Sequence, residues 1–172
     1  MPDLEVNVAG LKQLDEAMKQ LSDKLARNVL RAALRAGSKE IAEEAKRLVP
    51  VKTGRLRDTI RVTSRNIKGV PTAKVVAGGA SKGKRKGAFY APMIEFGTSA
   101  HIIRGRAGNA LRFNGVKVFE VQHPGSQKKP FMRPASDARA GAAVQRFAEY
   151  LRGRLTKEGI EIPDRSEERR VG

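Results

Sequence analysis

The sequence contains no cysteine and no tryptophan, and it has only two histidines. Without cysteine, disulfide bonds and thiolate metal sites are excluded. A zinc site needs three or four ligands at suitable spacing, which His101 and His123 alone do not supply. With two Tyr and six Phe, the core must be built mostly from aliphatic side chains. We therefore expect neither a metal nor another cofactor.

Long hydrophobic runs are also missing. The apolar stretches are short and interrupted by Lys or Arg, so we expect no membrane span. The first ten residues lack the basic segment followed by an apolar segment that marks a signal peptide. The sequence therefore predicts a protein made and used without secretion.

Motifs of catalysis are missing as well. No Gly-x-Ser-x-Gly elbow occurs, and residues 78–84 lack the Gly-x4-Gly-Lys-Ser/Thr spacing of a phosphate loop. Acidic residues are sparse outside the predicted helices, and Glu95 lies within an apolar run, between Ile94 and Phe96. A buried carboxylate there would suit a general acid, but we favour a structural role. It would pair with an arginine or cap backbone N–H groups beside Gly97. We do not expect an enzyme.

What the sequence has in excess is positive charge. It carries 35 Lys and Arg against 18 Asp and Glu, a formal net charge of +17. Such a field attracts polyanions with a strength that falls as salt is added. Contact with nucleic acid, contact with an acidic protein face and simple solvation of the surface are the three interpretations.

The last eight residues, 165–172, resemble the translation of a common sequencing adapter. On this interpretation the natural chain diverges near Asp164 and residues 165–172 are an artefactual tail. The alternative is an ordinary charged, disordered tail. Either way, we expect residues 1–164 to form a single domain.

Hydrophobic periodicity predicts helices in the first part of the chain. After a short strand over 4–8, apolar residues recur every three or four positions from Leu11 to Leu48. We expect a break at Ser22-Asp23, where either residue would cap a second helix. Gly37 is a weak helix former, but it would permit close packing. Pro50 should end the helical region.

From Leu56 the period changes to two. Residues 60–63 and 73–77 alternate as an antiparallel pair around a turn at 66–71. A flexible basic loop over 78–87, an apolar strand over 89–96, a long basic connector over 99–114 and one more strand over 116–121 should follow. Pro130 and Pro134 would bracket a turn before a helix over 135–155, with a stripe of Ala140, Val144, Phe147, Leu151 and Leu155. We predict an α+β fold, with N-terminal helices and a C-terminal helix packed on a small antiparallel sheet with long basic loops.

Three local patterns occur in a characteristic order. They are PVKTGRL at 50–56, YAPMIEFGT at 90–98, and HPGS at 123–126 followed by KPFMRPA at 129–135. After a helix start at 10–14, this succession resembles the gene-product-ten-like tail components of siphophages of the Hong Kong ninety-seven type, also called neck or tail-completion proteins. The resemblance covers roughly residues 8–150. The residues that carry it are Pro50, Thr53, Gly54, Leu56, Tyr90, Ala91, Glu95, Phe96, Gly97, Thr98, His123, Pro124, Gly125, Pro130, Phe131, Pro134 and Ala135.

The resemblance implies a structural virion protein that helps complete the tail and join it to the head. We expect the matched residues to be scaffold. Gly54 would reverse the chain from helix to strand at positive φ. Tyr90, Ile94 and Phe96 would anchor a strand, and Phe131 would fill the junction between sheet and helix.

A neck protein implies a homo-oligomeric ring that contacts head-closure, tail-terminator or tail-tube proteins in the virion, after assembly in the host cytoplasm. The long loops would order on docking. Their cations would meet phage DNA without sequence preference, or an acidic partner. These cations are Lys82, Lys84, Arg85, Lys86, Arg104, Arg106 and Arg112. The alternative is a free basic nucleic-acid-binding protein, which needs aromatic residues beside the cations. Phe89, Tyr90 and Phe113 are the candidates.

Overall fold

The computed structural model describes residues 11–19, 21–79, 87–105, 110–113 and 115–158. The strand predicted over 4–8, the basic residues 82–86, Arg106 and the tail 165–172 lie outside these ranges. The described ranges contain helices together with two-stranded antiparallel sheets, so the predicted α+β class is confirmed.

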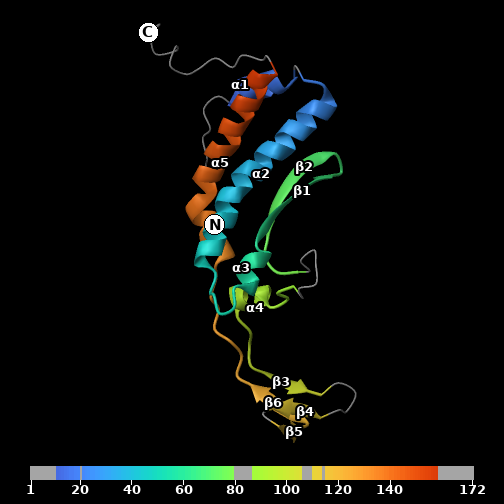
Figure 1. Ribbon diagram of the computed structural model, residues 1–172, viewed down its shortest axis with the longest axis vertical. Coiled ribbons are helices and arrows are strands. Elements are labelled where there is room, and N and C mark those ends of the chain that lie inside the picture. Colours follow the sequence, from blue (N-terminus) through green and yellow to red (C-terminus); the bar gives the residue numbers. More distant parts are fainter. Residues whose placement is uncertain (1–10, 20, 80–86, 106–109, 114, 159–172) are drawn as a thin grey trace.

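Two long helices form the centre of the molecule. After α1 (Leu11–Lys19), α2 (Asp23–Leu48) begins at the predicted break and ends before Pro50. Ser22 is the N-cap residue, but its side chain makes no capping hydrogen bond. Helix α5 (Met132–Lys157) packs along α2, with α1 against it near its C-terminal end (Figure 1).

Small residues line the contact between α2 and α5. Ala33, Ala45 and Ala135 are fully buried. A Cβ atom added to Gly37 would lie 2.4 Å from the carbonyl oxygen of Ala143. The two helices therefore approach each other closely at this glycine, as predicted.

One ion-pair cluster fastens the same two helices. The carboxylate of Glu44 on α2 accepts a hydrogen bond from Arg139 on α5 at 3.3 Å, and it also pairs with Arg47. The hydrogen bond from Arg47, followed by that from Arg139, holds the pKa of Glu44 below its usual value, although burial opposes this shift. Glu44 stays ionised near neutral pH and links the helices.

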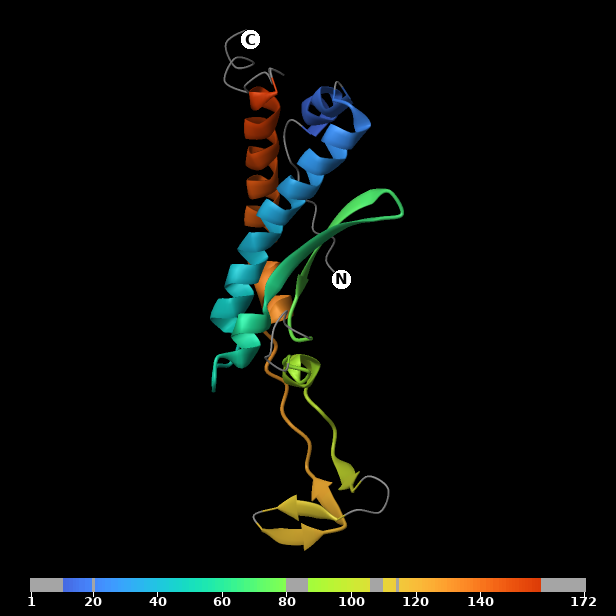
Figure 2. The same cartoon turned by 45° about the vertical axis from the view of Figure 1, so that its right-hand side comes forward.

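A two-stranded ribbon lies along α2 on the side away from α5 (Figures 1 and 2). Strands β1 (Arg61–Ile67) and β2 (Val70–Val76) pair from Arg61 opposite Val76 to Ile67 opposite Val70. The turn is tighter than predicted, because residues 66 and 71 are themselves paired. Lys68 and Gly69 both have positive φ, as a two-residue hairpin turn requires.

Two segments predicted as strand are short helices. Helix α3 (Arg55–Thr59) follows Gly54, which has the predicted positive φ of +74°. Leu56 and Ile60 are both buried, which is the spacing of a helical turn. Helix α4 (Ala91–Phe96) has proline in its first turn and buries Ala91 and Glu95, again four residues apart.

The predicted connector over 99–114 is also wrong, because it contains two strands. Strand β3 (His101–Arg104) pairs antiparallel with β6 (Glu120–His123), and β4 (Leu111–Phe113) pairs with β5 (Val116–Val118). The single strand predicted over 116–121 is therefore two strands. Strands this short acquire their conformation from the partner strand, which local periodicity does not report.

We call residues 98–126 the arm. It leaves the rest of the protein near α4 and projects along the long axis of the molecule, away from α1 (Figures 1 and 2). The rest of the described chain is the body. Its core has one cluster around Phe131 at the α4 end and another around Leu155 near α1.

The final helix begins at Met132, three residues before the predicted start. Pro134 therefore lies in its first turn, where a missing N–H group breaks no helical hydrogen bond. Of the predicted stripe, Leu151 and Leu155 are buried, and Ala140, Val144 and Phe147 are half-buried. A membrane span would need about 20 mainly apolar residues in succession, and none of the helices in the described ranges provides one.

Candidate interaction surface

The three sequence patterns meet where the arm joins the body. Leu56 from the first, Ala91 from the second, and Phe131 and Ala135 from the third share one buried cluster with Val49. Phe131 has no exposed surface. Segments that are far apart in the sequence therefore converge on a single junction.

Glu95 joins the second pattern to the third. Its Oε2 accepts hydrogen bonds from the backbone N–H groups of Phe131 at 2.7 Å and Met132 at 2.9 Å, and its Oε1 accepts one from Arg133 at 3.1 Å. The predicted capping of backbone N–H groups is thus found, but at the start of α5 rather than beside Gly97. A carboxylate at a helix N-terminus also interacts favourably with the helix dipole.

Two effects oppose each other in the ionisation of Glu95. Burial would raise the pKa of this carboxyl, but the hydrogen bonds from Met132, Phe131 and Arg133 outweigh it, so the pKa lies below its usual value. The carboxylate is ionised at neutral pH and accepts hydrogen bonds only. This arrangement suits a cap better than a general acid.

The base of the arm is held by backbone contacts across its two connecting segments. Thr98 and Ser126 exchange N–H to carbonyl hydrogen bonds of 3.0 Å in both directions, and the Lys129 N–H donates to Ile94 at 2.7 Å. An added Cβ would lie 2.7 Å from Ser126 O at Gly97 and 2.3 Å from Thr98 O at Gly125. Glycine at both positions lets the segments approach closely, which fixes the direction of the arm.

The two histidines lie side by side at this end of the arm. His101 pairs with His123 across β3 and β6, and their ring centroids are 5.0 Å apart. The ring Nδ1 of His123 accepts a hydrogen bond from the Gly125 N–H at 3.0 Å. In the described ranges, no group of three or more His, Asp or Glu side chains is placed to hold a metal ion.

Of the predicted basic contact residues, the described ones lie on the arm. Arg104 forms an ion pair with Glu120 at 3.3 Å. Arg112 is exposed and lies directly opposite Lys117 in the β4–β5 register. Two cations facing each other across a strand pair are unfavourable without an anion nearby. This part of the arm therefore carries closely spaced positive charge.

A groove of about 470 Å³ lies on the body beside the base of the arm. The groove is lined by three segments: α4, the start of α5, and one residue that follows β2. The lining residues are Ala91, Pro92, Glu95 and Phe96 from the first, Phe131, Met132, Arg133, Ser136 and Asp137 from the second, and Ala77. Phe96 is 69% exposed. The prediction that Phe96 anchors a strand is therefore wrong. Its side chain forms part of this open surface.

Comparison with known proteins identifies a family. A family model described as "Bacteriophage HK97-gp10, putative tail-component" matches residues 12–97, half of the 172 residues. The chain belongs to this family. No curated protein and no solved structure matches it.

The HK97-gp10-like match runs from α1 to Gly97 and ends where the arm begins. It includes the first sequence pattern and all of the second except Thr98, but not the third, so it is shorter than the resemblance drawn over 8–150. This protein is thus a phage tail component, a constituent of the virion that contacts other virion proteins. The arm and α5 lie outside the matched segment.

Sequence reasoning missed the groove and the strands of the arm. A signal for the acceptor at α5 was present, because residues 129–133 offer no Ser, Thr, Asp or Asn to cap the coming helix. The helix therefore needed an acceptor from elsewhere, which Glu95 provides. No comparable local signal marks the groove, whose lining comes from three separate segments.

Proposed function

We propose that this HK97-gp10-like protein is a non-catalytic subunit of the phage neck that helps complete the tail and join it to the head. The observation that carries the proposal is the family match over 12–97. The geometry of the arm supports it. A segment held away from the body by paired backbone and close-packed glycines is suited to reach a neighbouring subunit.

The subunit would act in a homo-oligomeric ring. An interface between two different surfaces of one chain, repeated by rotation, gives a closed ring when the rotations add up to a full turn and an open filament otherwise. The faces of such a ring would contact head-closure, tail-terminator or tail-tube proteins, after assembly in the host cytoplasm. Its residues need only bind and position these neighbours.

In this proposal the residues of the three sequence patterns are scaffold for the arm. The junction built from Leu56, Ala91, Phe131 and Ala135 gives the arm a rigid base, and Glu95 fastens the start of α5 to α4. Rigid support matters because ordering a loose segment on binding costs conformational entropy. A pre-positioned arm lowers that cost.

Deletion of the gene from the phage tests the proposed function. We expect filled heads and separate tails in electron micrographs and a loss of plaque-forming particles, with infectivity restored by the chain supplied in trans. As a control, the exposed ribbon variant Lys74→Gln should restore infectivity equally. Complete, infectious virions assembled without the gene would overturn the proposal.

The net charge of +17 favours a second candidate, a free nucleic-acid-binding protein. Of the predicted DNA contacts, Arg104 and Arg112 are both exposed, and Arg104 is also paired with Glu120. Both candidates include contact with DNA phosphates. They differ in whether the protein is found in the finished particle, which mass spectrometry of purified virions decides.

A further inference from the structure

The arm and the groove are two complementary surfaces on the same chain. We propose that the tip of the arm of one copy docks into the groove between α4 and α5 of the next copy. This inference rests on the proposed ring and identifies the contact that builds it. It assigns an interface to the segment beyond Gly97, outside the family match.

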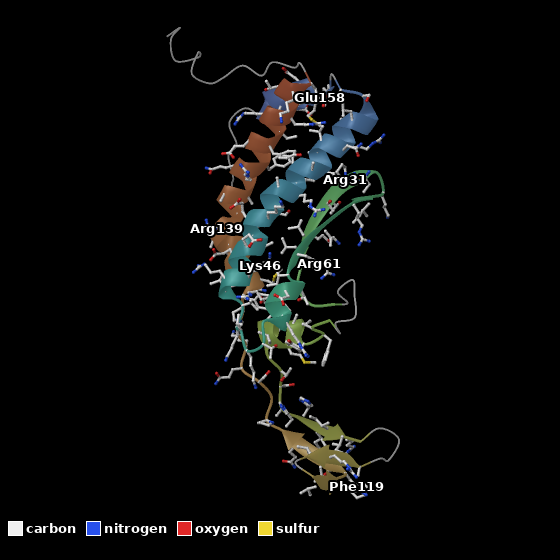
Figure 3. All side chains as sticks on the ribbon, in the orientation of Figure 1. Arg31, Lys46, Arg61, Phe119, Arg139 and Glu158 are labelled. Carbon is white, nitrogen blue, oxygen red and sulfur yellow. The ribbon has the colours of Figure 1, made fainter. Side chains whose placement is uncertain are left out.

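The tip of the arm carries apolar side chains that the body does not cover. Phe119 is 73% exposed and Val116 61%. Phe119 lies between β5 and β6, where its carbonyl oxygen accepts a hydrogen bond from the Gly105 N–H at 3.3 Å. Its backbone is thereby held while its ring faces solvent, at the far end of the arm (Figure 3). An aromatic side chain contributes about 150–250 Å² of burial when it finds a pocket.

The groove offers the apolar receptor that such a side chain needs. Phe131 and Ala91 lie beneath it as part of the buried cluster, and Phe96 borders it with an exposed ring. A volume of about 470 Å³ is ample for one aromatic side chain and its neighbours on a strand.

The charge of the groove is complementary to the charge of the arm. The ionisable lining of the groove is Glu95, Arg133 and Asp137, which sums to one negative charge in a chain whose total is +17. Glu95 is engaged by backbone N–H groups and by the charge of Arg133. That leaves the Asp137 carboxylate to receive a cation. Arg112 and Lys117 on the arm lie directly opposite each other, an unfavourable pairing that a nearby carboxylate would relieve.

A second copy is the occupant that these observations favour. Every copy brings both surfaces. The Thr98–Ser126 bridge with Gly97 and Gly125 lies at the base of the arm, and the arm points away from α4 and the start of α5 (Figure 2), whose residues line its own groove. An arm that docks in a neighbour joins two unlike surfaces. Such a heterologous contact propagates from copy to copy until the ring closes.

Site-specific disulfide crosslinking tests the contact. Because the chain has no native cysteine, only the introduced cysteines can crosslink. We would mix one chain carrying Val116→Cys at the arm tip with another carrying Ser136→Cys in the groove, and oxidise them. A disulfide-linked heterodimer is expected. The matched control pairs Val116→Cys with Val70→Cys, an exposed position at the ribbon turn. Equal crosslinking to residue 70, or mainly 116-to-116 dimers, would overturn the proposal.

Mixing of half-defective chains tests the direction of the contact. Phe119→Ser removes the anchor of the arm, and Ser136→Arg blocks the groove with bulk and a like charge. Wild-type protein should sediment as an oligomer and each variant alone as a monomer, with unchanged circular dichroism spectra. An equimolar mixture should give a dimer and nothing larger, because one intact arm and one intact groove remain. A wild-type monomer, or variants of wild-type size, would refute the contact.

These outcomes separate the inference from the proposed function. If arm and groove variants keep the wild-type oligomer while the gene deletion still leaves heads and tails unjoined, the contact is wrong and the neck role stands. If the contact is found but deletion leaves virions complete, the neck role is wrong and the contact stands.

Discussion

At the scale of single residues, Glu95 is the side chain on which the junction depends most. One carboxylate accepts three backbone N–H hydrogen bonds from the start of α5, at distances of 2.7–3.1 Å. It comes from α4, so it serves both as a helix cap and as a tie between two elements. Removing it leaves buried N–H donors without acceptors, which is more costly than losing an exposed ion pair.

We predict that Glu95→Gln lowers the free energy of unfolding by about 1–3 kcal/mol at pH 7. The amide keeps one acceptor oxygen but loses the charge and the second acceptor. Urea denaturation monitored by circular dichroism measures the loss. Glu43→Gln is the control, because Glu43 forms an exposed pair with Lys46 and should change stability by less than about 0.5 kcal/mol. Equal effects of the two substitutions would contradict the assigned role of Glu95.

The same prediction has a pH dependence with a definite sign. Because the folded-state pKa of Glu95 is lowered, its stabilisation is fully present above the unfolded-state pKa of about 4.3. It is lost as the pH falls from there through the folded-state pKa. The gap in stability between wild type and Glu95→Gln should therefore close in acid, and a gap that widens below about pH 4 would be inconsistent with this linkage.

At the scale of elements, the arm is a ladder of short strands fastened at its base. Residues 98 and 126 form the last bridge before the chain enters the body, and glycines stand beside both. Strands of three or four residues have little intrinsic stability. We infer that close packing at the base gives the arm its direction.

Gly125→Ala should therefore loosen the arm while sparing the body. The added Cβ would lie 2.3 Å from Thr98 O, at a φ of +88°. We expect faster hydrogen exchange over 101–104 and 120–123, equivalent to about 1–3 kcal/mol of local destabilisation, with little change over α2 and α5. Gly115→Ala is the matched control, since its φ is +84° but nothing lies within 4 Å of the added atom. Similar exchange rates in both variants would show that backbone strain, not packing at the base, accounts for the effect.

At the scale of the whole molecule, the large net positive charge influences how the protein associates with other molecules. A net charge of +17 makes copies of the chain repel one another and attracts nucleic acid. The groove is a place where negative charge is locally in excess. On the proposed function, the protein binds DNA diffusely over its surface and recognises a second copy of itself at the contact between arm and groove.

Binding to DNA should accordingly be weak, insensitive to sequence and steeply dependent on salt. Changing Lys82, Lys84, Arg85 and Lys86 to Gln should make the plot of log affinity against log salt less steep. The magnitude of its slope should fall by about 0.9 for each phosphate that the protein no longer neutralises. Pull-down on DNA across a salt series measures it. The control removes four charges elsewhere, with Arg35→Gln, Lys39→Gln, Arg65→Gln and Lys74→Gln. Equal retention of the loop variant and wild type would exclude residues 82–86 as the DNA contact.

Some of the structure follows from local pattern alone. The long helices were predictable because they repeat an apolar stripe over many turns, and the breaks at Ser22 and Pro50 are local backbone effects. The β1–β2 pair and the positive φ of Gly54 were equally readable. The sequence by itself thus determined the class of fold, the main helices and the cationic character of the chain.

The rest was decided only by tertiary contacts. Segments 55–59 and 91–96 are too short for their hydrophobic period to distinguish strand from helix. Their helical conformation places Leu56 and Ala91 in the buried cluster that contains Phe131. The arm strands exist because distant residues pair, and Glu95 found its N–H partners 36 to 38 positions along the chain. Periodicity reports only which side of an element is apolar. Which segments meet depends on packing between elements, and the groove and the direction of the arm arise from that packing.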